Sequence, residues 1–220
     1  MAGSFLVIGL GQFGSGIARE LTGHGGDVIA IDLHEGPVDA IGPHVSRALC
    51  LDATDEHGLA ELEPGRLDAV ICAIGAESIE ASILVTALLK ELGAKRIITR
   101  VTGDLHSRVI KRVGADELIN PEHEIARHVV QRVLLPTLRT AYEIAEGITV
   151  AEFCCPKKFI NKPIRELALR STHGVNIIAV KRAIGHETIG VPGPDVVVQE
   201  NDNILVVGKM ADVERISQES

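Results

Sequence analysis

Aromatic residues are scarce in this chain, which has no tryptophan, one tyrosine and four phenylalanines among its 220 residues. The hydrophobic fraction is nevertheless 45%, so the core has to be built from valine, isoleucine, leucine and alanine. Such a core is typical of buried parallel strands covered by helices. The length allows one large domain or two small ones.

Clusters of basic residues are also missing, and the formal net charge is −8. Because nucleic-acid phosphates are bound by grouped lysines and arginines, no nucleic-acid partner is expected. The chain lacks a secretory signal and any run of about 20 apolar residues, which predicts a cytoplasmic protein. None of its four cysteines forms a C-x-x-C pair, and no two histidines stand three or four residues apart. These spacings argue against a zinc site or a disulfide framework.

Strand-like and helix-like segments alternate over the first two thirds of the chain. The apolar, strand-like runs are Ser4–Gly9, Asp27–Asp32, Ser46–Leu51, Asp68–Gly75, Arg96–Val101 and the short Asp116–Ile119. The helical segments between them are Phe13–His24, Pro37–Gly42, Glu56–Leu62, Ile79–Leu92 and Asp104–Val113. This rhythm predicts an α/β fold, a Rossmann-type doubly wound parallel sheet, over residues 1–120.

The pattern changes after Pro121, where a connecting helix is expected from Glu122 to Arg139 within a hinge segment 121–142. Its apolar residues recur at helical spacing and form a stripe of Ile125, Val129, Val130, Val133 and Leu134. Part of this stripe is expected to pack against a second subunit. Pro136 should kink or end the helix, because proline lacks an amide proton.

Residues 143–220 predict a second, smaller α+β domain. Its expected strands are Ile148–Phe153, Val175–Lys181, Val196–Val198 and Asn203–Val207, and its expected short helices are Ile164–Leu169 and Ala211–Ile216.

A glycine motif marks a nucleotide site at the end of the first strand. Gly9, Gly11 and Gly14 form G-x-G-x-x-G between a strand and a helix, the context in which this motif binds dinucleotide phosphates. Gly9 permits the tight turn, Gly11 the approach of a phosphate and Gly14 the packing of helix on sheet. The alternative is a glycine turn in an unrelated α/β protein.

Asp32 ends the second strand, 18 residues after Gly14, near the spacing expected of a carboxylate that accepts both ribose hydroxyls. It would repel a 2′-phosphate, so NADP is disfavoured; the alternative is a solvated aspartate. Later strand ends should line the same crevice. The full set assigned to the adenine nucleotide is Gly9, Gly11, Gln12, Phe13, Gly14, Asp32, Leu33, Asp52, Ala53, Thr54, Ala73, Ile74, Gly75 and Arg100. For Arg100, a surface salt bridge is as good a prediction as a phosphate contact.

Several segments in this order resemble a known family. They are GLGQFG, AIDLHE, LDATDE, CAIGAESIEASILVTALLKELGA and GADELINPEHEIA, followed by NKPIRELALRSTHGVNIIAVKR, VPGP and QENDNILVVG. Together they resemble RCK domains, the regulators of potassium conductance, and in particular the cytosolic subunits of bacterial Ktr and Trk potassium-uptake systems. The resemblance covers nearly the whole chain.

The resemblance implies a homodimer that assembles into a ring beneath a membrane-embedded potassium-conducting subunit, and hence a cytoplasmic protein peripheral to the inner membrane. The implied ligand is ATP, ADP or NAD(H), which changes the shape of the ring and so controls the pore. Ktr-type members often carry arginine where this chain has Gln12. Glutamine loses the charge and the bidentate fork, which argues against discrimination of ATP from ADP and favours NAD(H), AMP or ADP.

Two further sites follow from the resemblance. Glu122 matches a glutamate that can help bind a cation near the nucleotide phosphates, although an acid in the first turn of a helix also favours the helix dipole. A cyclic di-AMP pocket in the second domain would be formed by Ile164, Arg170, Asn176, Ile177 and Pro192. The alternative is ordinary core with a surface arginine.

These observations favour a ligand-gated regulatory subunit and not an enzyme. The rival interpretation is a small NAD-dependent oxidoreductase, which needs a proton-transfer group beside the nicotinamide. The second domain offers no convincing set, since Lys157 and Lys158 lie in a turn and Tyr142 is the only tyrosine. A nucleotide sensor for an unrelated transporter would share the same physics.

Overall fold

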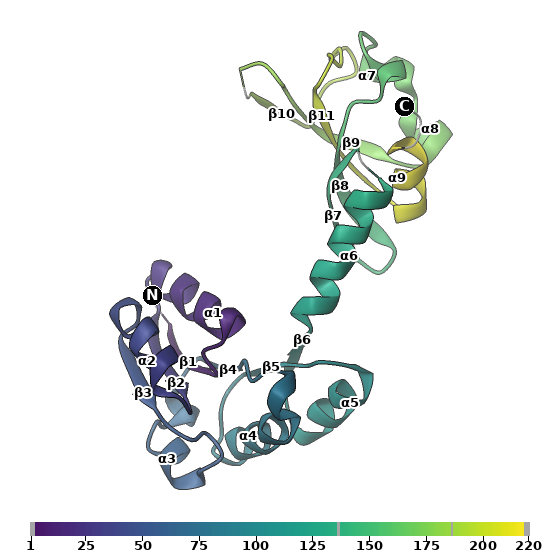
Figure 1. Ribbon diagram of the computed structural model, residues 1–220. Coiled ribbons are helices and arrows are strands. Elements are labelled where there is room, and N and C mark those ends of the chain that lie inside the picture. The colour runs from purple at the N-terminus through teal and green to yellow at the C-terminus, as the bar shows by residue number, and fades with distance from the viewer. Residues whose placement is uncertain (1–2, 136, 186, 218–220) are drawn as a thin grey trace. The chain divides into compact units, whose positions relative to one another are not determined.

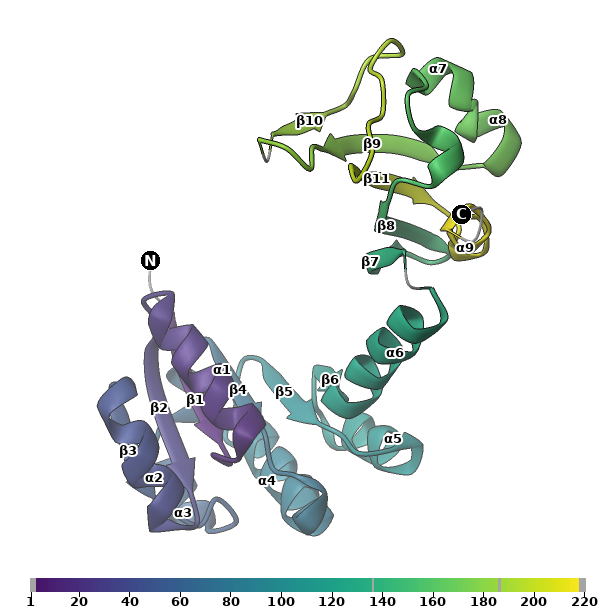
Figure 2. The ribbon, with the colours of Figure 1, turned by 45° about the horizontal axis from the view of Figure 1, so that its top comes forward.

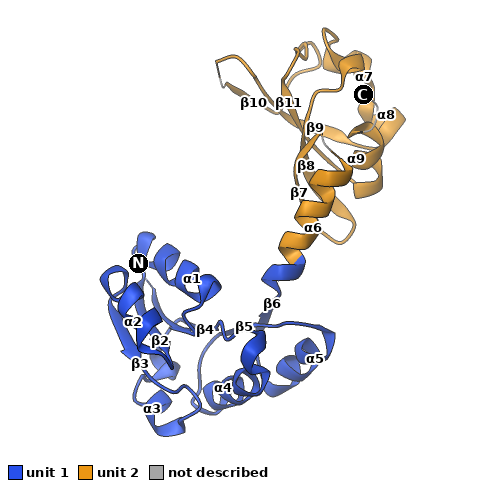
Figure 3. Ribbon diagram, in the orientation of Figure 1, with its two compact units in different colours: residues 1–123 blue, residues 124–220 orange. Residues whose placement is uncertain are grey.

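The computed structural model describes residues 3–135, 137–185 and 187–217. It divides into two compact units, residues 1–123 and 124–220 (Figure 3). Each unit has a sheet and a hydrophobic core of its own (Figure 1).

The described part of the first unit contains a six-stranded sheet in the order β3-β2-β1-β4-β5-β6, with all neighbouring strands parallel. The strands are β1 (Ser4–Ile8), β2 (Asp27–Asp32), β3 (Arg47–Cys50), β4 (Ala69–Cys72), β5 (Ile97–Arg100) and β6 (Glu117–Ile119). From β1 the chain adds β2 and β3 on one side, and it then crosses to the other side of β1 to add β4, β5 and β6. This order and its switch point confirm the Rossmann-type prediction.

Helices cover both faces of this sheet (Figure 2). They are α1 (Gln12–Gly23), α2 (Glu35–Ile41), α3 (Glu56–Ala60), α4 (Ile79–Glu91) and α5 (Asp104–Val113), with 3₁₀ turns η1 (Gly42–His44), η2 (Pro64–Arg66) and η3 (Ala76–Ser78). On β1, Val7 packs in the cluster that contains Ala18 of α1. Its neighbours Leu6 and Ile8 pack in the cluster of Leu89 from α4. Both faces of the strand are therefore buried, which explains why its sequence is a continuous apolar run.

The second unit contains a five-stranded sheet in the order β10-β9-β11-β8-β7, in which neighbouring strands are antiparallel. The strands are β7 (Leu138–Ala145), β8 (Ile148–Cys154), β9 (Asn176–Lys181), β10 (Thr188–Gly190) and β11 (Asn203–Gly208). Helices α7 (Ile164–Leu167), α8 (Leu169–His173) and α9 (Met210–Ser217) and the turn η4 (Lys157–Phe159) accompany them. Phe153 of β8 and Ile216 of α9 meet in its core, which makes this the smaller α+β domain that was predicted.

Helix α6 (Pro121–Leu134) begins in the first unit and continues in the second. Asn120 caps its N-terminus, since its side-chain oxygen accepts a hydrogen bond from the His123 N–H at 3.0 Å. The prediction that this helix runs to Arg139 is wrong, because it ends at Leu134 and Arg139 already belongs to β7. Pro136, predicted as the kink, lies outside the described residues.

Two other predictions for the second unit are wrong, and two of its strands were missed. Val196–Val198 is no strand: Val197 forms a single bridge with Pro163, because the backbone of this segment pairs with the loop before α7 and not with the sheet. The expected helix Ile164–Leu169 is split into α7 and α8 at Ala168, whose φ of 46° is left-handed. Strands β7 and β10 were not predicted at all.

Candidate nucleotide-binding site

The turn between β1 and α1 is fixed by its own glycines. Gly9 has a φ of 88°, a left-handed conformation that favours glycine. A β-carbon on Gly14 would stand 1.8 Å from the Gly9 carbonyl oxygen, so this position has no room for a side chain. The reason predicted for Gly14, close packing of helix on sheet, is therefore confirmed. No described atom lies within 4 Å of a β-carbon built on Gly11, which leaves its backbone open to a ligand.

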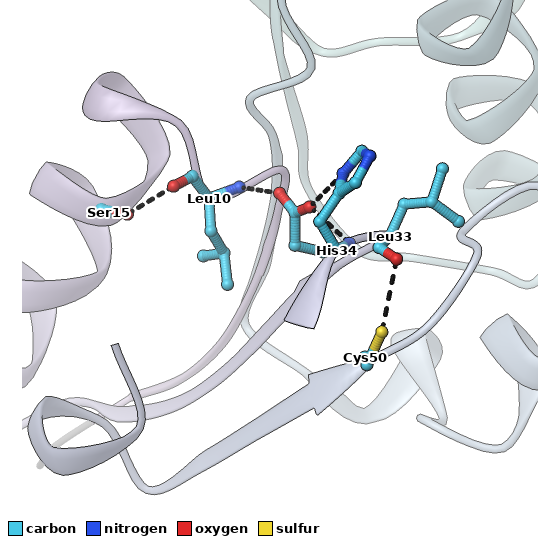
Figure 4. Close-up of polar contacts among 6 residues, drawn as sticks. Leu10, Ser15, Leu33, His34 and Cys50 are labelled. Atoms are coloured by element: carbon cyan, nitrogen blue, oxygen red, sulfur yellow. Dashed lines mark hydrogen bonds and ion pairs between the residues drawn. The ribbon is translucent and has the colours of Figure 1, made fainter. Parts of the chain in front are cut away.

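Asp32 joins this turn to the end of β2, and its side chain is only 13% exposed. Its Oδ2 accepts a hydrogen bond from the Leu10 N–H at 2.7 Å, and its Oδ1 accepts one from the His34 N–H at 2.9 Å (Figure 4). The turn is further tied by Ser15, whose hydroxyl donates to the Leu10 carbonyl at 2.7 Å. The carboxylate thus stands at the mouth of the glycine turn, fixed in direction by two backbone donors.

A cavity of about 190 Å³ opens at the carboxyl ends of the central strands of this sheet. Eleven of the fourteen predicted residues line it: Gly9, Gly11, Asp32, Leu33, Asp52, Ala53, Thr54, Ala73, Ile74, Gly75 and Arg100. The other three are placed elsewhere. Gln12 and Phe13 line a separate groove along α1, and Gly14 lies beneath the turn against Gly9.

Asp52 follows β3 on the same side of the cavity as Asp32. Its Oδ1 accepts two hydrogen bonds from Thr54, from the hydroxyl at 2.7 Å and from the N–H at 2.9 Å. The hydroxyl bond, followed by the backbone bond, lowers the pKa of Asp52 below its usual value. Two carboxylates therefore border the half of the cavity formed by β2 and β3.

Arg100 ends β5 and borders the other half of the cavity. One terminal nitrogen of its guanidinium forms an ion pair with Glu122, at the start of α6. The guanidinium also lies 5.8 Å from the centre of the Phe13 ring. Its Nε is buried and has no hydrogen-bond partner among the described residues. The sequence left a surface salt bridge and a phosphate contact as alternatives for Arg100. The side chain forms the salt bridge and also borders the cavity, so it remains a candidate phosphate contact.

Glu122 keeps its negative charge readily. A hydrogen bond from its own backbone N–H holds its pKa below the usual value, and Arg100 acts in the same direction while partial burial opposes both. Within the described ranges, no three His, Cys, Asp or Glu side chains gather as a metal site requires. The cation-binding role of Glu122 therefore stays a prediction.

Sequence reasoning missed several residues of the cavity, chiefly His34, Glu77 and Ser78. His34 directly follows the predicted ribose position, and its Nδ1 lies 3.2 Å from Asp32 Oδ1. Glu77 and Ser78 belong to η3, directly after the predicted strand end at Gly75. A signal existed in both cases, because ligands of such sheets bind outside the carboxyl ends of the strands, where the following loops lie.

The second unit has a separate cavity of about 630 Å³ beside α7, α8 and the start of β9. Four of the five residues predicted for cyclic di-AMP line it: Ile164, Arg170, Asn176 and Ile177. Pro192 does not. It belongs to a loop that Arg182 holds in place, donating to the Val197 carbonyl at 2.9 Å and to the buried Asp202 carboxylate at 2.5 Å.

Family models match both units of the chain. The TrkA-N domain model matches residues 5–121, and the TrkA-C domain model matches residues 156–219. Ktr system potassium uptake protein C of Bacillus subtilis (strain 168) is 34% identical over 218 residues, 99% of this chain and 97% of that protein. Ktr system potassium uptake protein A of Vibrio alginolyticus is 34% identical over 204 residues, 93% of this chain and 91% of that protein.

Solved structures of the GsuK channel share the fold. One superimposes with a TM-score of 0.69 at 17% identity, over 97% of this chain and 38% of the channel chain. The GsuK channel bound to NAD gives a TM-score of 0.65 at 18% identity, over 98% of this chain and 39% of that one. The chain thus spans about two fifths of these channel chains. In the part of the chain that the structure describes, no helix has the length and apolar character needed to cross a membrane.

Proposed function

Because this chain belongs to the family that carries TrkA-N and TrkA-C domains and includes the Ktr system potassium uptake proteins, we propose that it is the regulatory, nucleotide-binding subunit of a potassium-uptake system. It acts at the cytoplasmic side of the membrane on a separate potassium-conducting subunit. The single observation that carries the nucleotide part is the carboxylate of Asp32 fixed at the mouth of the Gly9–Gly14 turn.

The residues that line this cavity support an adenine nucleotide as its ligand. The ribose hydroxyls donate to Asp32, the phosphates lie over Gly11 at the N-terminus of α1, and Arg100 faces the phosphate side with an unpartnered Nε. The solved GsuK structures bound to NAD and to ADP, which share this fold, support the same class of ligand. We propose that Glu122, which pairs with Arg100, binds a divalent cation that accompanies the phosphates.

The proposal that copies of this chain assemble rests on the exposed apolar face of α6. Its polar residues Glu124, Arg127, His128 and Gln131 line cavities against β7 of the same unit. The stripe of Ile125, Val129, Val130, Val133 and Leu134 stays 53–72% exposed. A monomer would leave this apolar strip in water, so we propose that two copies pair through it and that such dimers build a ring.

The cavity beside α7 and α8 is the proposed cyclic di-AMP site of the second unit. Ile164 and Ile177 offer apolar surface to a base, and Arg170 offers a charge to a phosphate. Pro192 has no part in this cavity within one copy.

The rival function, an NAD-dependent oxidoreductase, has little support in the geometry. The titratable side chains that line the cavity are Asp32, Asp52, Glu77, His34 and Arg100. His34 is the single imidazole among them, and its ring lies against Asp32, where the ribose would lie. We therefore propose that the protein has no catalytic role.

Potassium uptake by the host organism tests the proposal. Deletion of this chain should lower uptake, wild-type protein should restore it, and a protein that cannot bind nucleotide should not restore nucleotide-dependent regulation. Uptake that is unchanged by the deletion would contradict the regulatory role.

A further inference from the structure

Glu77 places a carboxylate inside the proposed nucleotide cavity, at the half that the adenosine does not occupy. We infer that Glu77 selects the ligand: it favours a dinucleotide such as NAD(H), whose far half is a second ribose, over a nucleoside triphosphate. This inference rests on the proposed nucleotide-binding function and goes beyond it by naming the ligand class and the residue that decides it.

The side chain of Glu77 packs on Gly75, which lies between β4 and η3. Gly75 is buried although it lines the cavity. A β-carbon built on it would lie 2.3 and 2.5 Å from the two carboxylate oxygens of Glu77. The carboxylate therefore lies directly against the Gly75 backbone, in the space that a side chain at this position would otherwise fill.

Glu77 also has free acceptor capacity. Its carboxylate makes no hydrogen bond or ion pair with any described residue, and Glu77 is exposed where it lines the cavity. In this respect it differs from Asp32 and Asp52, whose oxygens already accept backbone or hydroxyl donors. A carboxylate with free lone pairs at a ligand cavity can accept two hydroxyl donors at once.

The strand order determines which part of a ligand meets Glu77. Asp32 and Asp52 follow β2 and β3, on one side of the glycine turn, and Glu77 and Arg100 follow β4 and β5, on the other. A ligand bound across the switch point has its adenosine on the first side and its phosphates over the turn. What extends beyond the phosphates therefore enters the space between Glu77 and Arg100.

The charges in that space decide between the two classes of nucleotide. A triphosphate would place its terminal phosphate beside the Glu77 carboxylate, and like charges at this distance repel. Arg100 compensates only in part, because Glu122 already shares its charge, and Gln12 brings no second cation. A second ribose is uncharged, and its hydroxyls can donate to Glu77. The same carboxylate thus attracts one ligand and repels the other.

Titration calorimetry without divalent cations, using NADH, ADP and ATP as probes, tests the inference on the full chain. Wild-type protein should bind NADH at least tenfold more tightly than ATP. Glu77→Gln, which removes the charge and keeps the shape, should narrow this ratio about tenfold or more by raising the affinity for ATP. Glu77→Ala should in addition weaken NADH. Glu80→Gln, an exposed position on α4 outside the cavity lining, is the matched control and should leave the ratio unchanged.

The outcomes separate this inference from the proposed function. Nucleotides that bind to wild-type protein with a ratio that Glu77→Gln does not change would overturn the selective role of Glu77 and leave the nucleotide site intact. ATP binding as tight as NADH binding in the wild type would do the same. A wild-type protein that binds none of the three probes would overturn the nucleotide site itself.

Discussion

Both oxygens of Asp32 accept hydrogen bonds from backbone N–H groups of the surrounding loops, one from Leu10 and one from His34. Oδ2 keeps a second lone pair, which we propose for a ribose hydroxyl, whereas Oδ1 also lies 3.2 Å from His34 Nδ1. The backbone bonds hold the carboxylate in one orientation, so little side-chain freedom remains to be lost when a ligand binds. Asp32 therefore fixes the turn, and we propose that it binds the ligand at the same time.

Replacing Asp32 tests this residue directly. Asp32→Ala should weaken the binding of NADH, ADP and ATP together, because all three share the ribose contact. The loss of a charged hydrogen bond corresponds to about 1.5–3 kcal/mol, which calorimetry would record as roughly a 10- to 150-fold change in Kd. Asp32→Asn, which retains one acceptor, is the control and should lose less. Unchanged affinity for all three nucleotides in Asp32→Ala would refute the assignment.

His106 on α5 should make the stability of the first unit depend on pH. The side chain is 6% exposed, and burial lowers its pKa below the usual value of 6.5. The unfolded chain therefore takes up a proton on His106 at a higher pH than the folded chain does. The corresponding stability is present above pH 6.5 and is lost as the pH falls below it.

Urea unfolding at pH 7 and pH 5 measures this effect. His106→Gln cannot titrate, so its midpoint should fall less between the two pH values than the wild-type midpoint does. His57→Gln, an exposed histidine, controls for the loss of a histidine as such. Equal falls in wild type and His106→Gln would show that His106 is not responsible.

Much of this residue-scale picture was accessible from the sequence. The glycines and Asp32 were predicted because both lie at the ends of apolar runs, where spacing along the chain translates directly into position. Glu77 was missed because an acid directly before a helix is also favoured by the helix dipole, so its type alone indicates no ligand. Only its packing on Gly75 distinguishes the two roles.

At the scale of elements, Arg100 connects the cavity with the first turn of α6. Arg100, at the end of β5, pairs with Glu122 in the first turn of α6, while its unpartnered Nε belongs to the same guanidinium that borders the cavity. A phosphate that binds Arg100 therefore competes with Glu122 or shares the guanidinium with it. We therefore expect nucleotide binding to act on the start of this helix.

Glu122→Gln separates competition from cation binding. Without divalent cations, the variant should bind ADP more tightly, by up to about 1 kcal/mol, the range of an exposed ion pair. With magnesium present, the wild type should gain affinity for ADP and the variant should gain less, because it lacks the carboxylate for the cation. Glu124→Gln, two residues further along α6, is the control. A variant that binds ADP more weakly in both conditions would contradict the competition between phosphate and Glu122.

The apolar stripe of α6 predicts the interface between two copies of the chain. Val133→Asp introduces a charge into each of the two facing helices of a dimer, and juxtaposed like charges cost several kcal/mol. The dimer should therefore dissociate at a concentration at least tenfold higher than in the wild type. Arg127→Asp, on the polar side of the same helix, should have a smaller effect. Light scattering across micromolar concentrations measures both, and a wild-type protein that is strictly monomeric would argue against the interface.

The elements that were mispredicted share a physical cause. Most residues of β7 are exposed, so the strand lacks the apolar run that identified the strands of the parallel sheet. Val196–Val198 looks like a strand in composition, yet its hydrogen bonds go to Lys162, Ile164 and their neighbours. In both cases the partner across the sheet, and not the segment itself, decides the conformation.

At the scale of the whole molecule, the two proposed ligands occupy different units of one chain. If both bias the same arrangement of the assembled protein, each must change the affinity for the other by the same factor. Titration of cyclic di-AMP into nucleotide-loaded and nucleotide-free protein should therefore give affinities that differ by about 1–3 kcal/mol. Arg170→Ala should weaken cyclic di-AMP and leave nucleotide binding unchanged, because the two cavities share no residue.

The controls separate the parts of this prediction. Lys209→Ala, outside the lining of the second cavity, removes a positive charge from the same unit and should leave cyclic di-AMP binding unaffected. Equal affinity in the loaded and free states would retain the second site and end the coupling. No binding in either state would remove the second site.

The length of α6 determines how far a change at its first turn would be carried along it. Its fourteen residues, at a rise of 1.5 Å per residue, make the helix about 21 Å long. If a nucleotide on Arg100 tilted a rigid helix of this length by about 10° at its base, the far end would move by roughly 4 Å. We expect an adjustment of a single guanidinium to be enlarged in this way to a displacement somewhat smaller than the spacing of neighbouring strands.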